Sequence, residues 1–236
     1  MTFTLNIAGI PIGIKHKYSY VSDISREYMT EEEPLFWISV TDGDIENEKS
    51  MAEGNFPAGV LESTAIYRAI SEKIADYGAF IFHGAVIEYE GKAYLFTAKS
   101  GVGKTTHIRL WQKLYKEKVS VLNGDKPVIR VMGDKILASG TPWRGKEGYG
   151  KPGISELSGI AFLERGKVNE AFPIDIDRAL IKFATQAYIP REYAAAKVLS
   201  LFGRVLEKIP LFTLRCNMED EAARVALSAF LTSENN

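Results

Sequence analysis

The sequence has little of what secreted or membrane-spanning proteins need. Only one of its 236 residues is a cysteine, Cys216, so no disulfide can form within the chain, and a cytoplasmic location is what we expect. No apolar run approaches the roughly 18 residues of a membrane-spanning helix. The first residues carry no basic group ahead of their apolar stretch, which argues against a secretory signal. We therefore expect a protein without a membrane segment.

The chain also lacks an excess of charge of either sign. Its 29 lysines and arginines balance 30 aspartates and glutamates, which leaves a formal net charge of −1. Such a balance provides no general attraction to nucleic acid or to an anionic membrane, so neither is expected as a partner. Hydrophobic residues make up 46% and charged residues 25% of the chain, which excludes a disordered or collagen-like protein.

The pattern of hydrophobic residues changes along the chain. Residues 2–14 and 35–40 predict short strands, and the acidic, glycine-containing stretch 41–59 predicts a linker or mobile loop. We therefore expect a β-rich appendage over residues 1–58 and a second domain, of the α/β class, over residues 59–236. In that domain we predict helices over 61–77, 104–117, 177–187, 192–208 and 219–231, and strands over 85–89, 93–97, 119–122, 128–131, 136–138, 158–164 and 212–216.

The strongest chemical signal is a strand, then the sequence AKSGVGKT, then a helix, at residues 93–117. Backbone amides of such a glycine-rich loop cradle phosphate oxygens, and the helix that follows adds the positive end of its dipole. Lys104 would reach the β- and γ-phosphates of a nucleotide, and the Thr105 hydroxyl would bind Mg²⁺. Ala98 stands where the usual G-x-x-x-x-G-K-[ST] pattern has its first glycine. The predicted nucleotide-binding residues are Ser100, Gly101, Val102, Gly103, Lys104, Thr105 and Thr106.

An acidic residue for the metal is predicted at Asp125. It follows the short strand 119–122 and the residues Asn123 and Gly124, where P-loop enzymes often place a metal-binding carboxylate. Asn-Gly-Asp is also an ordinary turn sequence, so Asp125 alone would indicate only a turn. Its place after the loop, one helix and one strand favours Mg²⁺ binding together with Thr105.

A basic, glycine-rich loop over residues 142–151 is the third signal. We expect it to be mobile without ligand and to close over triphosphate or an acidic substrate, with Arg144 and Lys146 as contacts. Glu147 could complete the metal site or position a cation. The alternative interpretation is a solvated basic loop, although Trp143 needs a surface on which to pack.

Several of these motifs together resemble the HPr kinase and phosphoenolpyruvate carboxykinase-like superfamily. The similarity is closest to small HPr kinase-like proteins and covers residues 60–232. The motifs that carry it are the form S-G-x-G-K-T at Ser100–Thr105, the pair His83-Gly84, the acidic Asn123-Gly124-Asp125, the segment Pro142–Glu147 and the LERG turn at Leu163–Gly166.

The resemblance implies a P-loop nucleotide-binding core of the phosphoenolpyruvate carboxykinase-like type, with a mixed sheet and C-terminal helices. It implies a kinase that uses ATP and Mg²⁺ to phosphorylate a hydroxyl, first a serine of a peptide or small protein and second a small molecule. The family has two adjacent aspartates where this chain has Gly124 and Asp125. The catalytic residues are thus predicted to be Asp125, His83 and Arg144, and the base is Asp125 itself, His83 or Glu147.

Two other classes of function stay open at this point. Gly124 also fits a nucleotide-binding sensor that has lost catalysis. A decarboxylase or carboxykinase acting on a C4 acid is disfavoured, because this chain is far shorter than those enzymes. A homo-oligomer is compatible with the sequence, and the acceptor and the nucleotide preference are left open.

Overall fold

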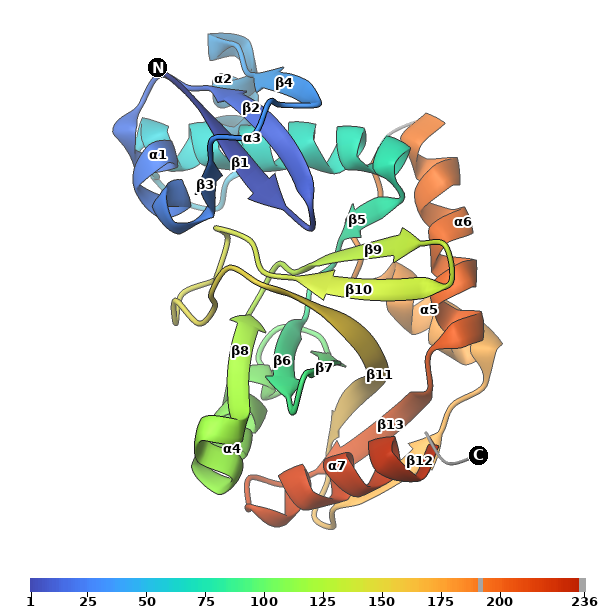
Figure 1. Ribbon diagram of the computed structural model, residues 1–236. Coiled ribbons are helices and arrows are strands. Elements are labelled where there is room, and N and C mark those ends of the chain that lie inside the picture. Colours follow the sequence, from blue (N-terminus) through green and yellow to red (C-terminus); the bar gives the residue numbers. More distant parts are fainter. Residues whose placement is uncertain (191–192, 234–236) are drawn as a thin grey trace.

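The computed structural model describes residues 1–190 and 193–233. It is a mixed α/β protein with a small N-terminal sheet, a large curled sheet and helices toward the C-terminus (Figure 1). Within the described residues no helix combines the length and the apolar character that crossing a membrane requires.

The N-terminal sheet has four strands in the order β3-β1-β2-β4. Strands β1 (Thr2–Ile7) and β2 (Ile10–Lys15) form an antiparallel hairpin, β3 (Met29–Thr30) pairs with β1, and β4 (Phe36–Ser39) runs parallel to β2. Alternate side chains of the hairpin are buried, as expected for a sheet with one face on a core. Helix α1 (Ser19–Ser25) and the 3₁₀ turn η1 (Arg26–Tyr28) connect β2 to β3.

The predicted linker over residues 41–59 is wrong in its first half, where helix α2 (Asp42–Met51) forms. Thr41 and Asp44 make a capping box: the Thr41 hydroxyl accepts from the Asp44 amide at 3.2 Å, and the Asp44 carboxylate accepts from the Thr41 amide at 2.7 Å. Glu48 is buried and pairs with Arg68 at 2.6 Å. The polar residues that suggested a loop therefore cap this helix and join it to its neighbour.

Helix α3 (Ala58–Lys73) and the 3₁₀ turn η2 (Ile74–Tyr77) fill the segment predicted as one helix over 61–77. Ile66 and Ile70 of α3 belong to one apolar cluster with the buried side chains of β1 and β2. The same cluster includes Ile81 and Val128 from the large sheet. A continuous core thus joins the two sheets, and a domain boundary between residues 58 and 59 stays a prediction.

The large sheet has the order β5-β9-β10-β11-β7-β6-β8, with β13 beside β11 and β12 beside β13. Strand β11 is long enough to pair with β10 through its first residues and with β13 through its last. The pairs β11–β7 and β11–β13 are parallel. The strands predicted over 85–89 and 93–97 pair as the antiparallel hairpin β6–β7, and those predicted over 128–131 and 136–138 pair as the hairpin β9–β10. The strands are β5 (Ala79–Ile81), β6 (Ala85–Tyr89), β7 (Lys92–Thr97), β8 (Val119–Asn123), β9 (Val128–Met132), β10 (Lys135–Ser139), β11 (Ile154–Arg165), β12 (Glu170–Pro173) and β13 (Leu211–Cys216).

Helices cover both faces of this sheet (Figure 1). Helices α4 (Lys104–Tyr115) and α7 (Glu221–Ser233) contribute Trp111 and Phe230 to one core, and α4 is followed by the 3₁₀ turn η3 (Lys116–Lys118). Helices α5 (Ile176–Ala184) and α6 (Tyr193–Lys208) contribute Phe183 and Phe202 to the other. The three C-terminal helices were predicted; residue 192, where the second was expected to begin, lies outside the described residues.

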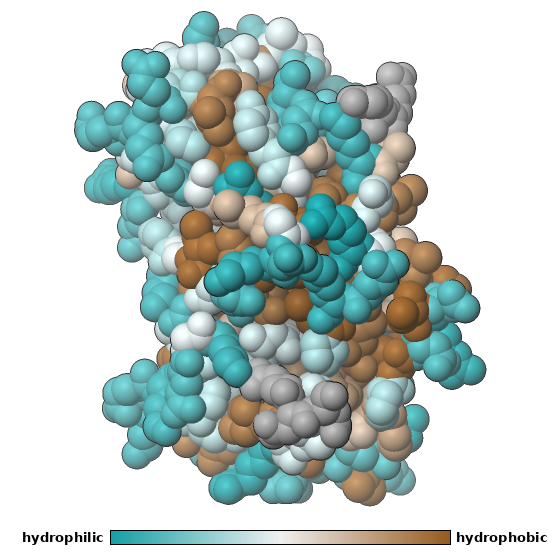
Figure 2. Space-filling model, turned by 45° about the vertical axis from the view of Figure 1, so that its right-hand side comes forward, coloured by the Kyte–Doolittle hydropathy of each residue, from teal (hydrophilic) through white to brown (hydrophobic). Residues whose placement is uncertain are grey.

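Hydrophobic side chains also reach the surface. Figure 2 shows them in several patches between hydrophilic residues. Helix α5 exposes Ile176, Leu180 and Ile181. The helix is strongly amphipathic, and its other side buries Ala179 and Phe183 in the core.

Candidate functional site

The glycine-rich loop joins β7 to α4, as the sequence predicted. Gly101 and Gly103 have φ angles of +79° and +134°, a region that residues with a Cβ rarely adopt. The Lys104 side chain is only 9% exposed and donates a hydrogen bond to the Ala98 carbonyl at 2.9 Å. Burial lowers the pKa of Lys104, and the nearby Asp125 carboxylate opposes that effect. Lys104 is therefore held against its own loop, beside a carboxylate.

Asp125 is positioned by the buried side chain of Asn123 at the end of β8. The side-chain oxygen Oδ1 of Asn123 accepts from the backbone amides of Asp125 at 2.8 Å and Lys126 at 2.6 Å. The Asn123 amide group donates to the carbonyl oxygen of Thr141 at 3.1 Å and to its hydroxyl at 3.0 Å. The predicted Asn-Gly-Asp turn is thus present and is hydrogen-bonded to Thr141, the residue that precedes the basic loop.

Two cationic or proton-bearing groups face the Asp125 carboxylate. His83 Nε2 lies 3.3 Å from Oδ1, and Lys126 Nζ lies 3.8 Å from Oδ2. Burial alone would raise the pKa of Asp125, but the hydrogen bond from His83 and the charges of Lys126 and Lys104 outweigh it and lower the pKa. Asp125 is therefore a carboxylate at neutral pH.

His83 is itself oriented by Gln186. Its Nδ1 lies 3.1 Å from Gln186 Oε1, and its backbone amide donates to the Gln186 carbonyl at 2.7 Å. With one ring nitrogen on Gln186 and the other on Asp125, the imidazole supports the carboxylate. His83 thus positions the Asp125 carboxylate, and Gln186 orients His83. Nothing in the sequence indicated this role for Gln186.

The basic loop covers Gly124 closely. The Gly124 amide donates to the Tyr149 carbonyl at 2.9 Å, and a Cβ at Gly124 would lie 3.1 Å from Tyr149 Cβ and 3.2 Å from that carbonyl oxygen. Lys151 continues the contact, since its amide donates to the Leu122 carbonyl at 3.2 Å. A second acid beside Asp125 would therefore need this part of the loop to move.

Two side chains of the basic loop reach two other elements, η1 and α4. Arg144 pairs with Glu27, and its guanidinium lies 5.3 Å from the Tyr28 ring centre. Glu147 pairs with Arg109 of α4 at 2.7 Å. Contact of Arg144 or Lys146 with phosphate, a metal role for Glu147, and mobility of the loop all stay predictions. For Arg144 to bind a substrate, its pair with Glu27 would have to open.

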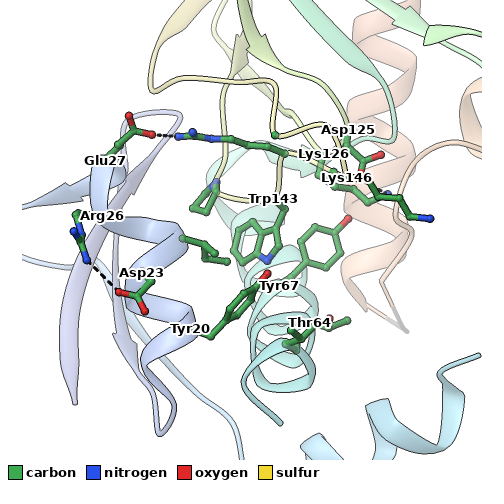
Figure 3. Close-up of a pocket in the computed structure, with 16 residues that line it drawn as sticks. Tyr20, Asp23, Arg26, Glu27, Thr64, Tyr67, Asp125, Lys126, Trp143 and Lys146 are labelled. Carbon is green, nitrogen blue, oxygen red and sulfur yellow. Dashed lines mark hydrogen bonds and ion pairs between the residues drawn. The ribbon is translucent and has the colours of Figure 1, made fainter. Parts of the chain in front are cut away.

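A cleft of about 990 Å³ lies between α1, α3 and this loop. Figure 3 shows Asp125, Lys126 and Lys146 at one end, with Trp143, Tyr67 and Tyr20 extending from there along the cleft. We call it the aromatic cleft. Burial and the neighbouring Asp125 raise the pKa of Tyr67, so its phenol keeps its proton.

A second cleft, of about 430 Å³, lies beside the glycine-rich loop. We call it the loop-side cleft. The Arg165 side chain lies along one edge and donates to the carbonyls of Gly101 at 2.5 Å and Val102 at 3.3 Å. The cleft is lined by Gly101, Val102, Gly103, Thr106, His107, Leu163, Glu164, Arg165, Gly166, Cys216, Asn217 and Met218.

The structure thus brings His83, Lys104 and Asp125 into one electrostatic group. Ser100 is exposed in the loop, and Thr105 and Thr106 are half-buried on the first turn of α4. Glu147 is paired elsewhere. The sequence did not indicate that Tyr67 and His107 line clefts, since both occur in ordinary helical patterns.

The donor set is compatible with Mg²⁺, although the described residues contain no cluster of three or more His, Cys, Asp or Glu side chains. Mg²⁺ commonly takes one or two protein ligands and completes its shell with water and substrate phosphates. The Asp125 carboxylate, ionised at neutral pH, and the Thr105 hydroxyl provide ligands of the required hard oxygen type.

Comparison with known proteins gives only distant structural likenesses. No family model matches the chain, and no curated protein sequence matches it. Among solved structures, the HPr(Ser) kinase/phosphatase from Coxiella burnetii is similar over 65% of this chain and 98% of its own, at 9% identity and a TM-score of 0.38. The chain thus has a distant structural resemblance to an HPr kinase/phosphatase.

Proposed function

We propose that the protein is an Mg²⁺- and ATP-dependent phosphotransferase that transfers the γ-phosphoryl group to a hydroxyl. The observation that carries the proposal is that a buried lysine at a glycine-rich loop, Lys104, lies within electrostatic reach of an ionised carboxylate at the next strand end, Asp125. Phosphoryl transfer needs little covalent chemistry from the protein, so positioning and charge stabilisation dominate.

The loop supplies the nucleotide side of this proposal. Backbone amides over residues 100–106 and the positive end of α4 would bind the phosphate oxygens. Lys104 would exchange its hydrogen bond with the Ala98 carbonyl for one with the β- or γ-phosphate. That exchange replaces a neutral acceptor by an anionic one, which strengthens the hydrogen bond.

Asp125 supplies the acceptor side. Bound Mg²⁺, held by Asp125 and Thr105, would neutralise charge on the phosphates. The Asp125 carboxylate, oriented by His83, would also accept the hydrogen bond of the attacking hydroxyl. Its lowered pKa makes it a weak base, which suits a loose transition state in which the proton moves late.

The aromatic cleft is the proposed acceptor site, because Asp125 lies at its end (Figure 3). Its volume exceeds that of a single small side chain, and Tyr20, Tyr67 and Trp143 offer stacking surfaces. These features favour a serine within a peptide or small protein over a small molecule. In this proposal Arg144 and Lys146 bind the acceptor, and Glu147 holds Arg109 in place.

Gly124 favours a second candidate, a nucleotide-binding sensor without catalysis. A second acid beside Asp125 would press its Cβ against Tyr149, so this part of the loop would have to shift to admit it. A sensor would bind ATP through the glycine-rich loop and leave its γ-phosphate in place.

Transfer of ³²P from γ-labelled ATP to a hydroxyl-containing peptide library separates these candidates. Asp125→Asn should lower turnover at least about 100-fold, the usual scale for a group that handles the proton. Asp134→Asn is the matched control, because Asp134 is a fully exposed carboxylate in the β9–β10 turn. Full activity of the Asp125→Asn variant would remove Asp125 from the mechanism, and ATP binding without transfer to any acceptor would favour the sensor.

A further inference from the structure

One residue that lines the loop-side cleft, His107, has a buried ring nitrogen without a hydrogen-bond partner among the described residues. His107 lies near the start of α4, only 2% exposed, and its Nδ1 makes no hydrogen bond within the described residues. Buried polar atoms in proteins are almost always paired, so an unpaired one calls for a missing ligand or water. His107 is also one of the residues that line the cleft.

The protonation of His107 follows from its other contact. Trp111 Nε1 donates to His107 Nε2 at 2.9 Å, and an indole N–H can only donate. Nε2 is therefore an acceptor, and the proton of the neutral ring is on Nδ1. Burial lowers the pKa of His107 to about 3, so the ring is neutral at physiological pH. The free Nδ1–H is thus an uncharged donor.

The rest of the cleft is suited to an uncharged group, because its two charged side chains are already engaged: Glu164 pairs with Lys182 at 2.6 Å, and Arg165 donates to the loop carbonyls. Val102, Leu163 and Met218 give it apolar walls, and its volume of about 430 Å³ lies within the range of small-molecule sites. Thr106 and the glycines of the loop form its other side, so a group bound here would be continuous with phosphates on the loop. A neutral donor favours a ring nitrogen, a carbonyl or a hydroxyl over a phosphate.

We propose that the loop-side cleft binds the nucleoside part of the triphosphate, and that His107 donates its Nδ1–H to an uncharged acceptor on the base or the ribose. This inference rests on the proposed function, because it takes the phosphates to lie on the glycine-rich loop. It adds the site that distinguishes a nucleotide from a bare polyphosphate and makes His107 a specificity-determining residue.

Cys216 provides a test in the unmodified protein. It is the chain's single cysteine, it lines this cleft, and burial raises the pKa of its thiol. Alkylation by iodoacetamide at alkaline pH, followed by mass spectrometry, measures how accessible it is. At about ten times its dissociation constant, Mg·ATP should slow alkylation about tenfold, since only the unoccupied protein reacts. Mg·tripolyphosphate at equal saturation should leave the rate within about twofold of the free protein.

The outcomes separate this inference from the proposed function. If tripolyphosphate binds and ATP protects Cys216 no better than tripolyphosphate does, the cleft assignment is overturned and the loop assignment stands. If the protein binds neither ligand, both assignments are overturned.

A variant of His107 sharpens the test. His107→Leu should weaken Mg·ATP binding about 5- to 10-fold, the value of one hydrogen bond, and leave the affinity for tripolyphosphate unchanged. Met218→Ser is the companion variant, because Met218 is 78% exposed and its truncation leaves the core intact while it removes an apolar wall. It should also weaken ATP selectively. Equal losses for both ligands, or no loss in either variant, would assign His107 to the core alone.

Discussion

The two clefts of this protein differ in how their polar groups are satisfied. In the aromatic cleft several charged side chains are paired: Arg26 with Asp23, Arg144 with Glu27 and Lys126 with Asp125. Lys146 and the buried Arg144 Nε make no hydrogen bond or ion pair within the described residues. The loop-side cleft is lined by the glycine-rich loop and by His107, whose buried Nδ1 makes no hydrogen bond within the described residues. The aromatic cleft therefore offers charged and aromatic side chains to a ligand, whereas the loop-side cleft offers loop backbone, apolar side chains and one neutral histidine.

The first test of this comparison concerns the close packing of the basic loop on Gly124, at the aromatic cleft. Gly124→Ala should lower the free energy of unfolding by about 1–3 kcal/mol, because its Cβ meets Tyr149 and the loop that closes the aromatic cleft must shift. Gly203→Ala, in α6 with open space around its Cβ, is the control and should raise stability by about 0.5–1 kcal/mol. Urea unfolding measures both. A Gly124→Ala protein as stable as the unmodified one would show that the loop is loose here.

The ion pair between Arg144 and Glu27 gives a smaller effect. A double-mutant cycle with Arg144→Gln and Glu27→Gln should yield a coupling energy of about 0.5–1 kcal/mol, because Glu27 is largely exposed and solvent screens the pair. The neighbouring Arg26–Asp23 pair, exposed on both sides, is the matched control and should give about 0–0.3 kcal/mol. Coupling no larger than that of the control would mean that Arg144 is free to bind a ligand in the aromatic cleft.

Much of the fold could be predicted, because its signals are local. Glu90 and Gly91 form a tight turn with positive φ angles, so the hairpin β6–β7 follows from the sequence. The strand, glycine-rich loop and helix were predicted for the same reason. Helix α2 was missed because Thr41 and Asp44, which cap it, are also typical of polar loops. The strand β12 and the helix α1 are short and were missed as well.

The candidate site was only partly predictable, since its walls come from distant parts of the chain. Lys104 could be predicted from the glycine-rich loop motif, and Asp125 from its place in the Asn-Gly-Asp turn after a strand. Tyr20, Tyr67 and Trp143 meet only through the packing of α1, α3 and the basic loop. The Trp143 indole, for example, donates to the Ser63 hydroxyl at 3.0 Å. Nothing local to these residues indicates that they face the same space.

Calorimetric titration with Mg·ATP tests the central claim most directly. Lys104→Ala should weaken binding about 10- to 100-fold, because it removes a charge-assisted contact worth about 1.5–3 kcal/mol. Lys99→Ala is the matched control: Lys99 is an exposed lysine of the same loop, and its loss should change affinity less than about threefold. Equal affinity for ATP in the Lys104→Ala variant and the unmodified protein would contradict the assignment of this loop to nucleotide phosphates.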